Sequence, residues 1–164
     1  MKTVNEIMKS QPQSVTKNET LKSALNQMDK SNIGFLPVVD DNQKVIGTIT
    51  DRDIALAIGK TSKSAQQIKV HEVMNSRVHC IKPEDDAASA LKIMRTKQVG
   101  RLPVVDSENK LKGMVSLTGM ARKIKNSKEQ AELEHQGKEN IVNTLHSLAE
   151  RTQKLENVDE EAEE

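Results

Sequence analysis

A threonine and an aspartate three residues apart, Thr50 and Asp53, are the side chains whose types and spacing best suit chemistry. Their segment, Gly47–Asp53, runs from an apolar stretch into an expected helix, where free backbone N–H groups and the helix dipole favour a phosphate. The Asp53 carboxylate can accept hydrogen bonds from two sugar hydroxyls. Gly47 would permit close approach of a ligand. The same spacing fits a capping box, and spacing alone favours that plainer interpretation.

Recognised catalytic motifs do not occur in the sequence. The histidines at positions 71, 79, 135 and 146 lack metal-ligand spacing, and there is no Walker, HExxH, GxSxG or GxGxxG pattern. Cys80 is the single cysteine, which rules out an internal disulfide. Its place in a short expected strand favours a half-buried structural thiol over a nucleophile. We therefore expect no enzyme activity, no cofactor and no metal.

The composition narrows the function classes further. The chain has 164 residues, no Trp, no Tyr and one Phe, which excludes a platform of aromatic side chains for stacking single-stranded nucleic acid. No apolar run approaches the roughly 18 residues of a membrane span. The first residues lack the apolar region of a signal peptide. These features predict a cytoplasmic protein that does not enter a membrane.

The net charge of +1 conceals two regions of opposite charge. Residues 1–125 carry 21 Lys and Arg against 13 Asp and Glu, and residues 126–164 carry 4 against 11. The body therefore has a net charge of +8 and the tail one of −7. A basic body suits a phosphate-bearing ligand or nucleic acid. The net charge is the single feature that favours nucleic acid, so we do not expect nucleic acid as the partner.

The chain contains a tandem duplication. A shift of 66 residues aligns residues 4–54 with residues 70–120 without a gap, and 16 of the 51 pairs are identical. The longest identical run is LPVVD, at Leu36–Asp40 and Leu102–Asp106. Three further matched pairs are Met8 with Met74, Gly34 with Gly100, and Gly47 with Gly113.

The hydrophobic pattern predicts the same elements in both copies. Each has a short strand, a helix that ends at Gly34 or Gly100, two apolar strands and a second helix. We expect an α/β (α+β) fold with the order β-α-β-β-α twice and pseudo-two-fold symmetry. The expected segments are 14–16, 21–33, 35–39, 45–49 and 51–58 in the first copy, and 80–82, 87–99, 102–105, 111–115 and 117–124 in the second.

The duplicated unit resembles the CBS domain, and the pair resembles a Bateman module of the stand-alone bacterial type. The resemblance is carried by the Met8 and Met74 openings, Gly34–Asp40, Val99–Asp106 and Gly47–Asp53. It covers residues 1–125. We expect one CBS repeat at 1–64, a second at 65–125, and an acidic, partly helical tail at 126–164.

The resemblance implies that an adenine-containing nucleotide binds between the two repeats. AMP, ADP, ATP or another adenosine compound would fit. Thr50 would contact phosphate, Asp53 the ribose hydroxyls and Thr48 the base. Arg101 of the second repeat would meet a phosphate. The residues that would enclose the adenine are Cys80, Ile81, Val99 and Pro103.

The symmetry-related site departs from the pattern. Ser116 matches Thr50, but Gly119 replaces Asp53 and Phe35 replaces Arg101. Losing the carboxylate removes charge-assisted hydrogen bonds to ribose, so we expect this second site to be weak, altered or vacant. Its residues would be Ser14, Val15, Ile33, Phe35, Pro37, Met114 and Ser116.

The resemblance also implies a regulatory role and a homodimer. The leading hypothesis is a non-catalytic module that binds an adenine nucleotide and signals to a partner protein. The alternative is a ligand-free dimerisation or protein-interaction module. The expected dimer face comprises Ile54, Leu56, Ala57 and Ile58, with Met120, Ala121 and Ile124 in the second copy.

The tail carries a short heptad-like stripe. Its residues are spaced alternately four and three apart, which predicts a helix that needs a partner, either the body or a second chain. A solvated helix with frayed ends is the alternative. The stripe comprises Ile141, Leu145, Leu148, Thr152 and Leu155.

Overall fold

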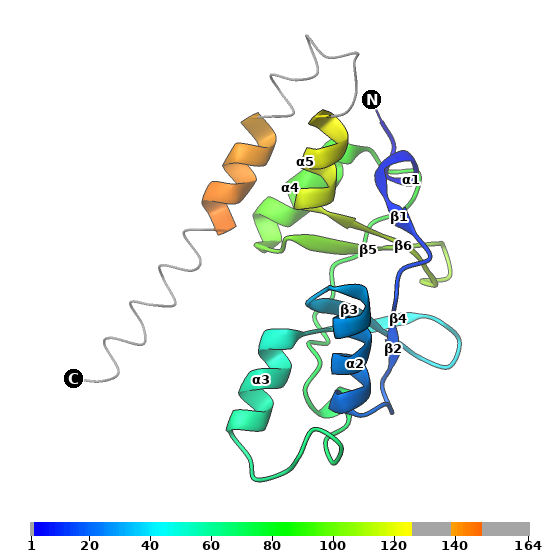
Figure 1. Ribbon diagram of the computed structural model, residues 1–164. Helices are drawn as coiled ribbons and strands as arrows, with labels where there is room; N and C mark the ends of the chain where they lie inside the picture. Colours follow the sequence, from blue (N-terminus) through cyan, green and yellow to red (C-terminus); the bar gives the residue numbers. More distant parts are fainter. Residues whose placement is uncertain (1, 126–138, 149–164) are drawn as a thin grey trace, which may run out of the picture. The chain divides into compact units, whose positions relative to one another are not determined.

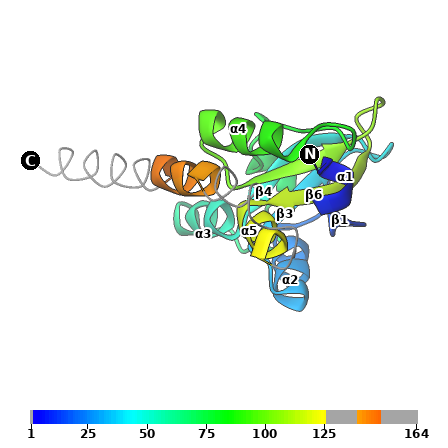
Figure 2. The same ribbon diagram turned by 90° about the horizontal axis from the view of Figure 1, so that it is seen from above.

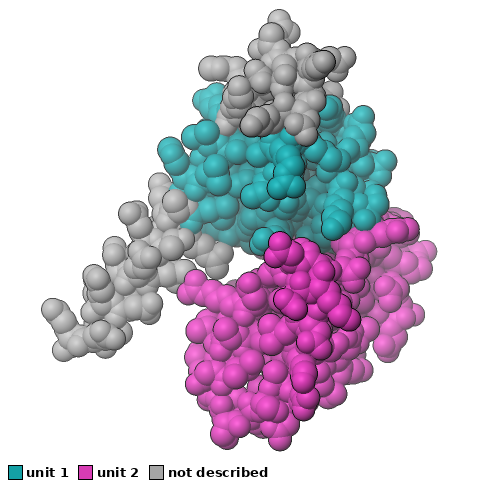
Figure 3. All heavy atoms as spheres, viewed as in Figure 1, with its two compact units in different colours: residues 1–10, 81–104, 113–164 teal, residues 11–80, 105–112 magenta. Residues whose placement is uncertain are grey.

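The computed structural model describes residues 2–125 and 139–148 (Figure 1). The chain divides into two compact units, coloured separately in Figure 3. Unit 1 comprises Met1–Ser10, Ile81–Val104 and Gly113–Glu164, and unit 2 comprises Gln11–Cys80 and Val105–Lys112. Each compact unit therefore takes segments from both sequence repeats.

Unit 2 is built on a three-stranded sheet. The strand order is β2-β3-β4, with β2 parallel to β3 and β3 antiparallel to β4. Buried Leu36, Val38 and Ile49 join side chains from both helices in one core. The elements are β2 (Val15–Thr16), α2 (Leu21–Ser31), β3 (Phe35–Val39), β4 (Val45–Thr50), α3 (Asp51–Gly59) and the 3-10 helix η1 (Val70–Glu72).

Unit 1 is also built on a three-stranded sheet, in which the strand order is β1-β6-β5. A parallel bridge between Ile81 and Val104 stands where the short first strand of the second copy was expected. The elements are α1 (Val4–Ile7), β1 (Lys9–Ser10), α4 (Ala87–Lys97), β5 (Arg101–Val105), β6 (Leu111–Ser116) and α5 (Leu117–Lys125). The last residue of β5 and the first two of β6 belong to unit 2. The predicted α+β fold class is confirmed.

The two repeats exchange their opening segments. Lys9 and Ser10 of β1 pair antiparallel with β6 (Figure 2). In unit 2, Asn75 from the second repeat takes the matching place beside β4, where it exchanges two backbone hydrogen bonds with Thr48, of 3.0 and 2.8 Å. The repeat therefore supplies the edge segment of each sheet from the other copy.

This exchange explains the matched methionines and glycines. A Cβ on Gly47 would lie 3.0 Å from both the Met74 sulfur and the Asn75 carbonyl oxygen. A Cβ on Gly113 would collide with the Met8 sulfur. The expectation that Gly47 admits a ligand is therefore wrong, because the chain itself makes the close approach there.

The expected ends of the first helix in each repeat also need correction. The left-handed residues after α2 and α4 are Asn32 and Gln98, with φ of 49° and 51°. Gly34 lies two residues later and has no positive φ. A side chain at Gly34 would instead collide with the Asp51 carboxylate.

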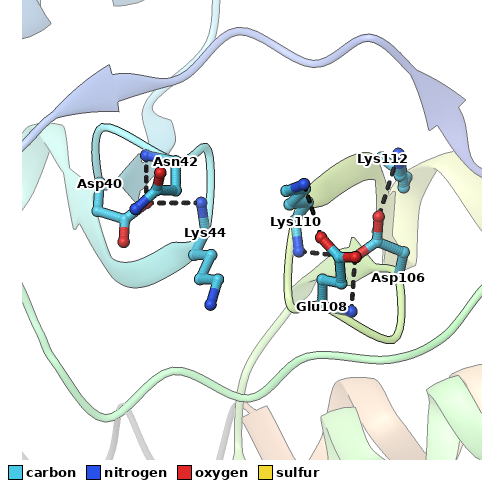
Figure 4. Close-up of polar contacts among 7 residues, drawn as sticks. All are labelled: Asp40, Asn42, Lys44, Asp106, Glu108, Lys110 and Lys112. Atoms are coloured by element: carbon cyan, nitrogen blue, oxygen red, sulfur yellow. Dashed lines mark hydrogen bonds and ion pairs between the residues drawn. The ribbon is translucent and has the colours of Figure 1, made fainter.

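The aspartates that end the two LPVVD runs organise matching turns (Figure 4). One carboxylate oxygen of Asp40 accepts the N–H groups of Asn42 and Lys44, both at 2.9 Å. Asp106 accepts those of Glu108 and Lys110 in the same way, at 3.0 and 2.9 Å. The Lys110 N–H bond is the main cause that lowers the pKa of Asp106, with Lys112 adding to it. The identical aspartates are thus turn residues.

The helical residues 139–148 pack on unit 1, so the body is the partner of this helix. Ile141 is 9% exposed and belongs to the core cluster of that unit, and Leu148 packs against the same cluster. Thr144 is 1% exposed. Leu145 is wrongly placed in the predicted stripe, because it is 50% exposed. Thr152 and Leu155 lie outside the described residues.

We predict that Gly113→Ala lowers the free energy of unfolding by about 1–3 kcal/mol, the usual cost of overpacking. The reason is the collision between the new Cβ and Met8. Gly100→Ala is the control, because no atom lies within 4 Å of a Cβ there. Urea denaturation measures both variants, and equal stabilities would contradict the account of Gly113.

Candidate functional site

Thr50 and Asp53 form a capping box at the start of α3. The Thr50 hydroxyl accepts the Asp53 N–H at 3.1 Å, and Oδ2 of Asp53 accepts the Thr50 N–H at 2.9 Å and its hydroxyl at 2.7 Å. The interpretation favoured by spacing alone is therefore correct. A carboxylate offers about four lone-pair positions on two oxygens. Asp53 can therefore cap the helix and still accept hydrogen bonds from a ligand.

The start of α5 has the same hydroxyl cap without the carboxylate. The Ser116 hydroxyl accepts the Gly119 N–H at 3.1 Å, the distance found at Thr50. The first turn of α3 holds Asp51 and Asp53, whereas the first turn of α5 holds no acidic residue. The two helix starts thus share geometry but differ in charge and in acceptor capacity.

One face of the unit 2 sheet carries residues predicted for both sites. Residues along β4 alternate between buried and half-buried, and Thr48 and Thr50 lie on the half-buried face. In the register, Phe35 pairs with Thr50 and Pro37 with Thr48. Unit 2 therefore brings together a predicted ribose and phosphate segment and a predicted adenine wall.

Unit 1 carries the predicted site residues that come from the corresponding strands of the second repeat. The Leu117 N–H donates to the Gly100 carbonyl at 3.0 Å, which places Arg101 beside the start of α5. The Asp51 N–H makes the matching bond to Gly34, at 3.3 Å. Of the other predicted residues, Pro103 is buried, and Val99, Met114 and Ser116 are half-buried.

Four of the predicted adenine-enclosing residues, Val15, Ile81, Ser14 and Ile33, differ in exposure. Val15 and Ile81 are buried in the cores of their own units. Their side chains therefore pack inward, and the Ile81 N–H donates to the Pro103 carbonyl at 3.0 Å. Ser14 and Ile33 are half-buried.

Cys80 is half-buried, as expected, and packs against Val39, Val45 and Val105 of unit 2. Burial raises the pKa of its thiol to about 11. The thiol is therefore neutral near pH 7, which suits a packing role and does not suit a nucleophile.

The expected dimer face is partly wrong, because two of its residues are core residues. Ile54 and Met120 are buried in the cores of units 2 and 1. Ala57 and Ile58 pack against the unit 2 core, and Ala121 against that of unit 1. Leu56 is 49% exposed and remains available to a partner. The side chain of Ile124 is not among those that the structure describes.

Residues 2–125 and 139–148 contain neither a metal-binding cluster nor a helix that could span a membrane. No three His, Cys, Asp or Glu side chains gather there in a way that suits a metal ion. None of the helices in these ranges combines the length and apolar character that a bilayer crossing requires.

The model of the CBS domain matches residues 4–60 and 70–126. This chain therefore belongs to the CBS-domain family, and it carries two copies of the domain, as the resemblance predicted.

Curated relatives support this assignment. The CBS domain-containing protein YhcV of Bacillus subtilis is 36% identical over 122 residues, which cover 74% of this chain and 84% of that protein. The inosine-5'-monophosphate dehydrogenase of Methanocaldococcus jannaschii is 34% identical over 125 residues, which cover 76% of this chain. The match spans only 24% of that enzyme's length.

Solved structures of CBS pairs resemble this chain throughout the repeats. One CBS domain pair, in complex with 5'-methylthioadenosine and S-adenosyl-L-methionine, is 26% identical with a TM-score of 0.66, and the match covers 74% of this chain and 98% of the other. CBSX2, a protein of Arabidopsis thaliana solved in complex with AMP, is 26% identical with a TM-score of 0.65, covering 75% and 96%.

We predict that iodoacetamide alkylates Cys80 about a hundredfold more slowly in the folded protein than in urea at pH 8. The thiol pKa rises from 9.0 to about 11 on folding, which reduces the reactive thiolate by that factor. Folding holds this proton more tightly, so the associated stability is lost as the pH rises from about 9 to 11. Equal rates in the two states would contradict the burial of Cys80.

Proposed function

We propose that this chain is a non-catalytic regulatory module that binds an adenosine compound and signals its presence to a partner protein. The observation that carries the proposal is the start of α3, where Asp53 caps the helix through one oxygen and keeps acceptor capacity for ribose. Two structural neighbours at 26% identity hold adenosine compounds, which supports the same ligand class here.

The chemistry of the α3 start favours a sugar over a phosphate as its main contact. Two carboxylates in the first turn repel an anion, whereas sugar hydroxyls donate hydrogen bonds to the Asp53 carboxylate. An exposed cation such as Arg101 suits a phosphate better. The remaining contacts, from Thr48, Cys80, Ile81, Val99 and Pro103, belong to the same proposal.

A second, weaker site is also part of the proposal. Its helix start has the Ser116 hydroxyl but no carboxylate at Gly119, and its expected wall includes Phe35, whose ring can stack on a base. The cytoplasmic location, the homodimer and the absence of catalysis likewise remain proposals.

One observation favours the alternative function, an interaction module without a ligand. Leu56 exposes half of its side chain on α3, which suits contact with another protein. Calorimetric titration with AMP, ADP, ATP, a cyclic dinucleotide and S-adenosylmethionine separates the two functions. Binding of none of them at millimolar concentration would leave the interaction module as the better account.

We predict that Asp53→Asn weakens binding of the tightest ligand in this panel by about one to two orders of magnitude. The amide oxygen can still cap α3, but charge-assisted bonds worth roughly 1.5–3 kcal/mol are lost. Asp51→Asn is the matched control, because it removes the same charge from the same helix turn. Calorimetry measures both variants, and equal affinities of Asp53→Asn and the wild type would refute the site.

We also predict that Gly119→Asp creates a stronger second binding event in the same titration. The Ser116 cap already matches the Thr50 cap, and a Cβ at Gly119 would meet only the Ser116 hydroxyl, at 2.9 Å. Thr118→Asp is the control, since it adds the charge at a neighbouring exposed position. A titration indistinguishable from that of Thr118→Asp would argue against the second site.

A further inference from the structure

The helix at residues 139–148 contacts unit 1 at a particular place, the last turn of α4 (Figure 1). The Ser147 hydroxyl donates a hydrogen bond of 3.3 Å to the Arg95 carbonyl. Ile141 is buried in the unit 1 core, and Leu148 packs against that core. The inward face is therefore spaced as Ile141, Thr144 and Leu148, which is the spacing of one helical face.

The last turn of α4 leads directly into residues of the proposed ligand site. The Gln98 N–H donates to the Arg95 carbonyl at 3.4 Å, and the Val99 N–H donates to the Met94 carbonyl at 3.0 Å. The Arg95 carbonyl thus accepts bonds from both Ser147 and Gln98. β5 then begins at Arg101.

The same core cluster joins the helix to the ligand residues by packing. Ile141 shares this cluster with Ile81 and with Leu117, the first residue of α5, and Val99 packs against it. Any change in how Ile141 packs therefore changes the surroundings of two predicted adenine-enclosing residues.

We propose that residues 139–148 position the unit 1 residues to which the proposed function assigns ligand contacts, with Ile141 and Ser147 as positioning residues. The docked helix holds Val99 and Arg101 in their binding arrangement. By linkage, a bound ligand must stabilise the docked helix to the same extent. The docking of residues 139–148 on unit 1 then reports whether the ligand is bound. This inference rests on the proposed function.

The test uses the full chain and two neighbouring substitutions. Ile141→Ser removes a buried contact, and Val142→Ser is its matched control, because Val142 is 47% exposed on the same helix. AMP and ATP are the probes in calorimetry. We expect about fivefold or greater loss of affinity for Ile141→Ser, wild-type affinity for Val142→Ser, and recovery of most of the affinity in Ile141→Val.

Hydrogen exchange supplies a second readout, the protection of residues 139–148 relative to that of the other amides in the chain, because ligand binding by itself slows exchange globally. In the wild type, AMP or ATP should slow exchange of the amides at residues 139–148, and Ser147→Ala should reduce that protection. This measurement keeps the test valid if Ile141→Ser fails to fold, because the wild type and Ser147→Ala retain the core contact.

The outcomes distinguish the two proposals. If the wild type binds neither probe nor any other adenosine compound, the proposed function fails and the coupling fails with it. If the wild type binds and Asp53→Asn weakens binding, the proposed function stands. Unchanged affinity in Ile141→Ser together with exchange at 139–148 that does not respond to the probe would then overturn the coupling alone.

Discussion

The exchange of opening segments between the repeats is the constraint on which the rest of the structure depends. A strand edge exposes unpaired N–H and C=O groups, and β4 and β6 each receive their outer partner from the other repeat. The exchange also carries core residues, since Val4 is buried in unit 1 and Val70 in unit 2. Neither repeat therefore contains the whole of its own core. Glycine at positions 47 and 113 follows from this arrangement, because the exchanged methionines occupy the space beside them.

Duplication has preserved the geometry of the two helix starts and changed their chemistry. Thr50 and Ser116 cap their helices at the same hydrogen-bond length of 3.1 Å. Asp53 adds a carboxylate to one of them, and Gly119 leaves the other without a carboxylate. A cap stabilises a helix by about 1 kcal/mol through its hydroxyl alone. The second helix start is therefore capped without a carboxylate. Capping alone does not require Asp53 at the first helix start, which is consistent with a separate use of that side chain.

The helix at residues 139–148 is the one described element outside the family match, and it nevertheless completes the core of unit 1. Its two faces differ, because Ile141 and Thr144 are buried while Val142 and Leu145 are half exposed. A segment that lies beyond the duplicated fold and packs on a single unit breaks the equivalence of the two copies. It gives the second repeat a contact at Arg95 through the Ser147 hydroxyl.

Much of the fold could be predicted from the sequence, because the duplication repeats the apolar pattern of the helices and strands. The apolar runs of β3 and β5, the stripe of α2 and the capping spacing of Thr50 and Asp53 depend on neighbours a few residues away. What only the tertiary structure decided involves contacts distant along the chain. The partners of Gly47 and Gly113, the inward-facing side chains of Ile54 and Met120, and the exposure of Leu145 each depend on which element packs against them. A stripe of apolar residues shows that a helix has an apolar face, but the direction of that face is set by the surface it meets.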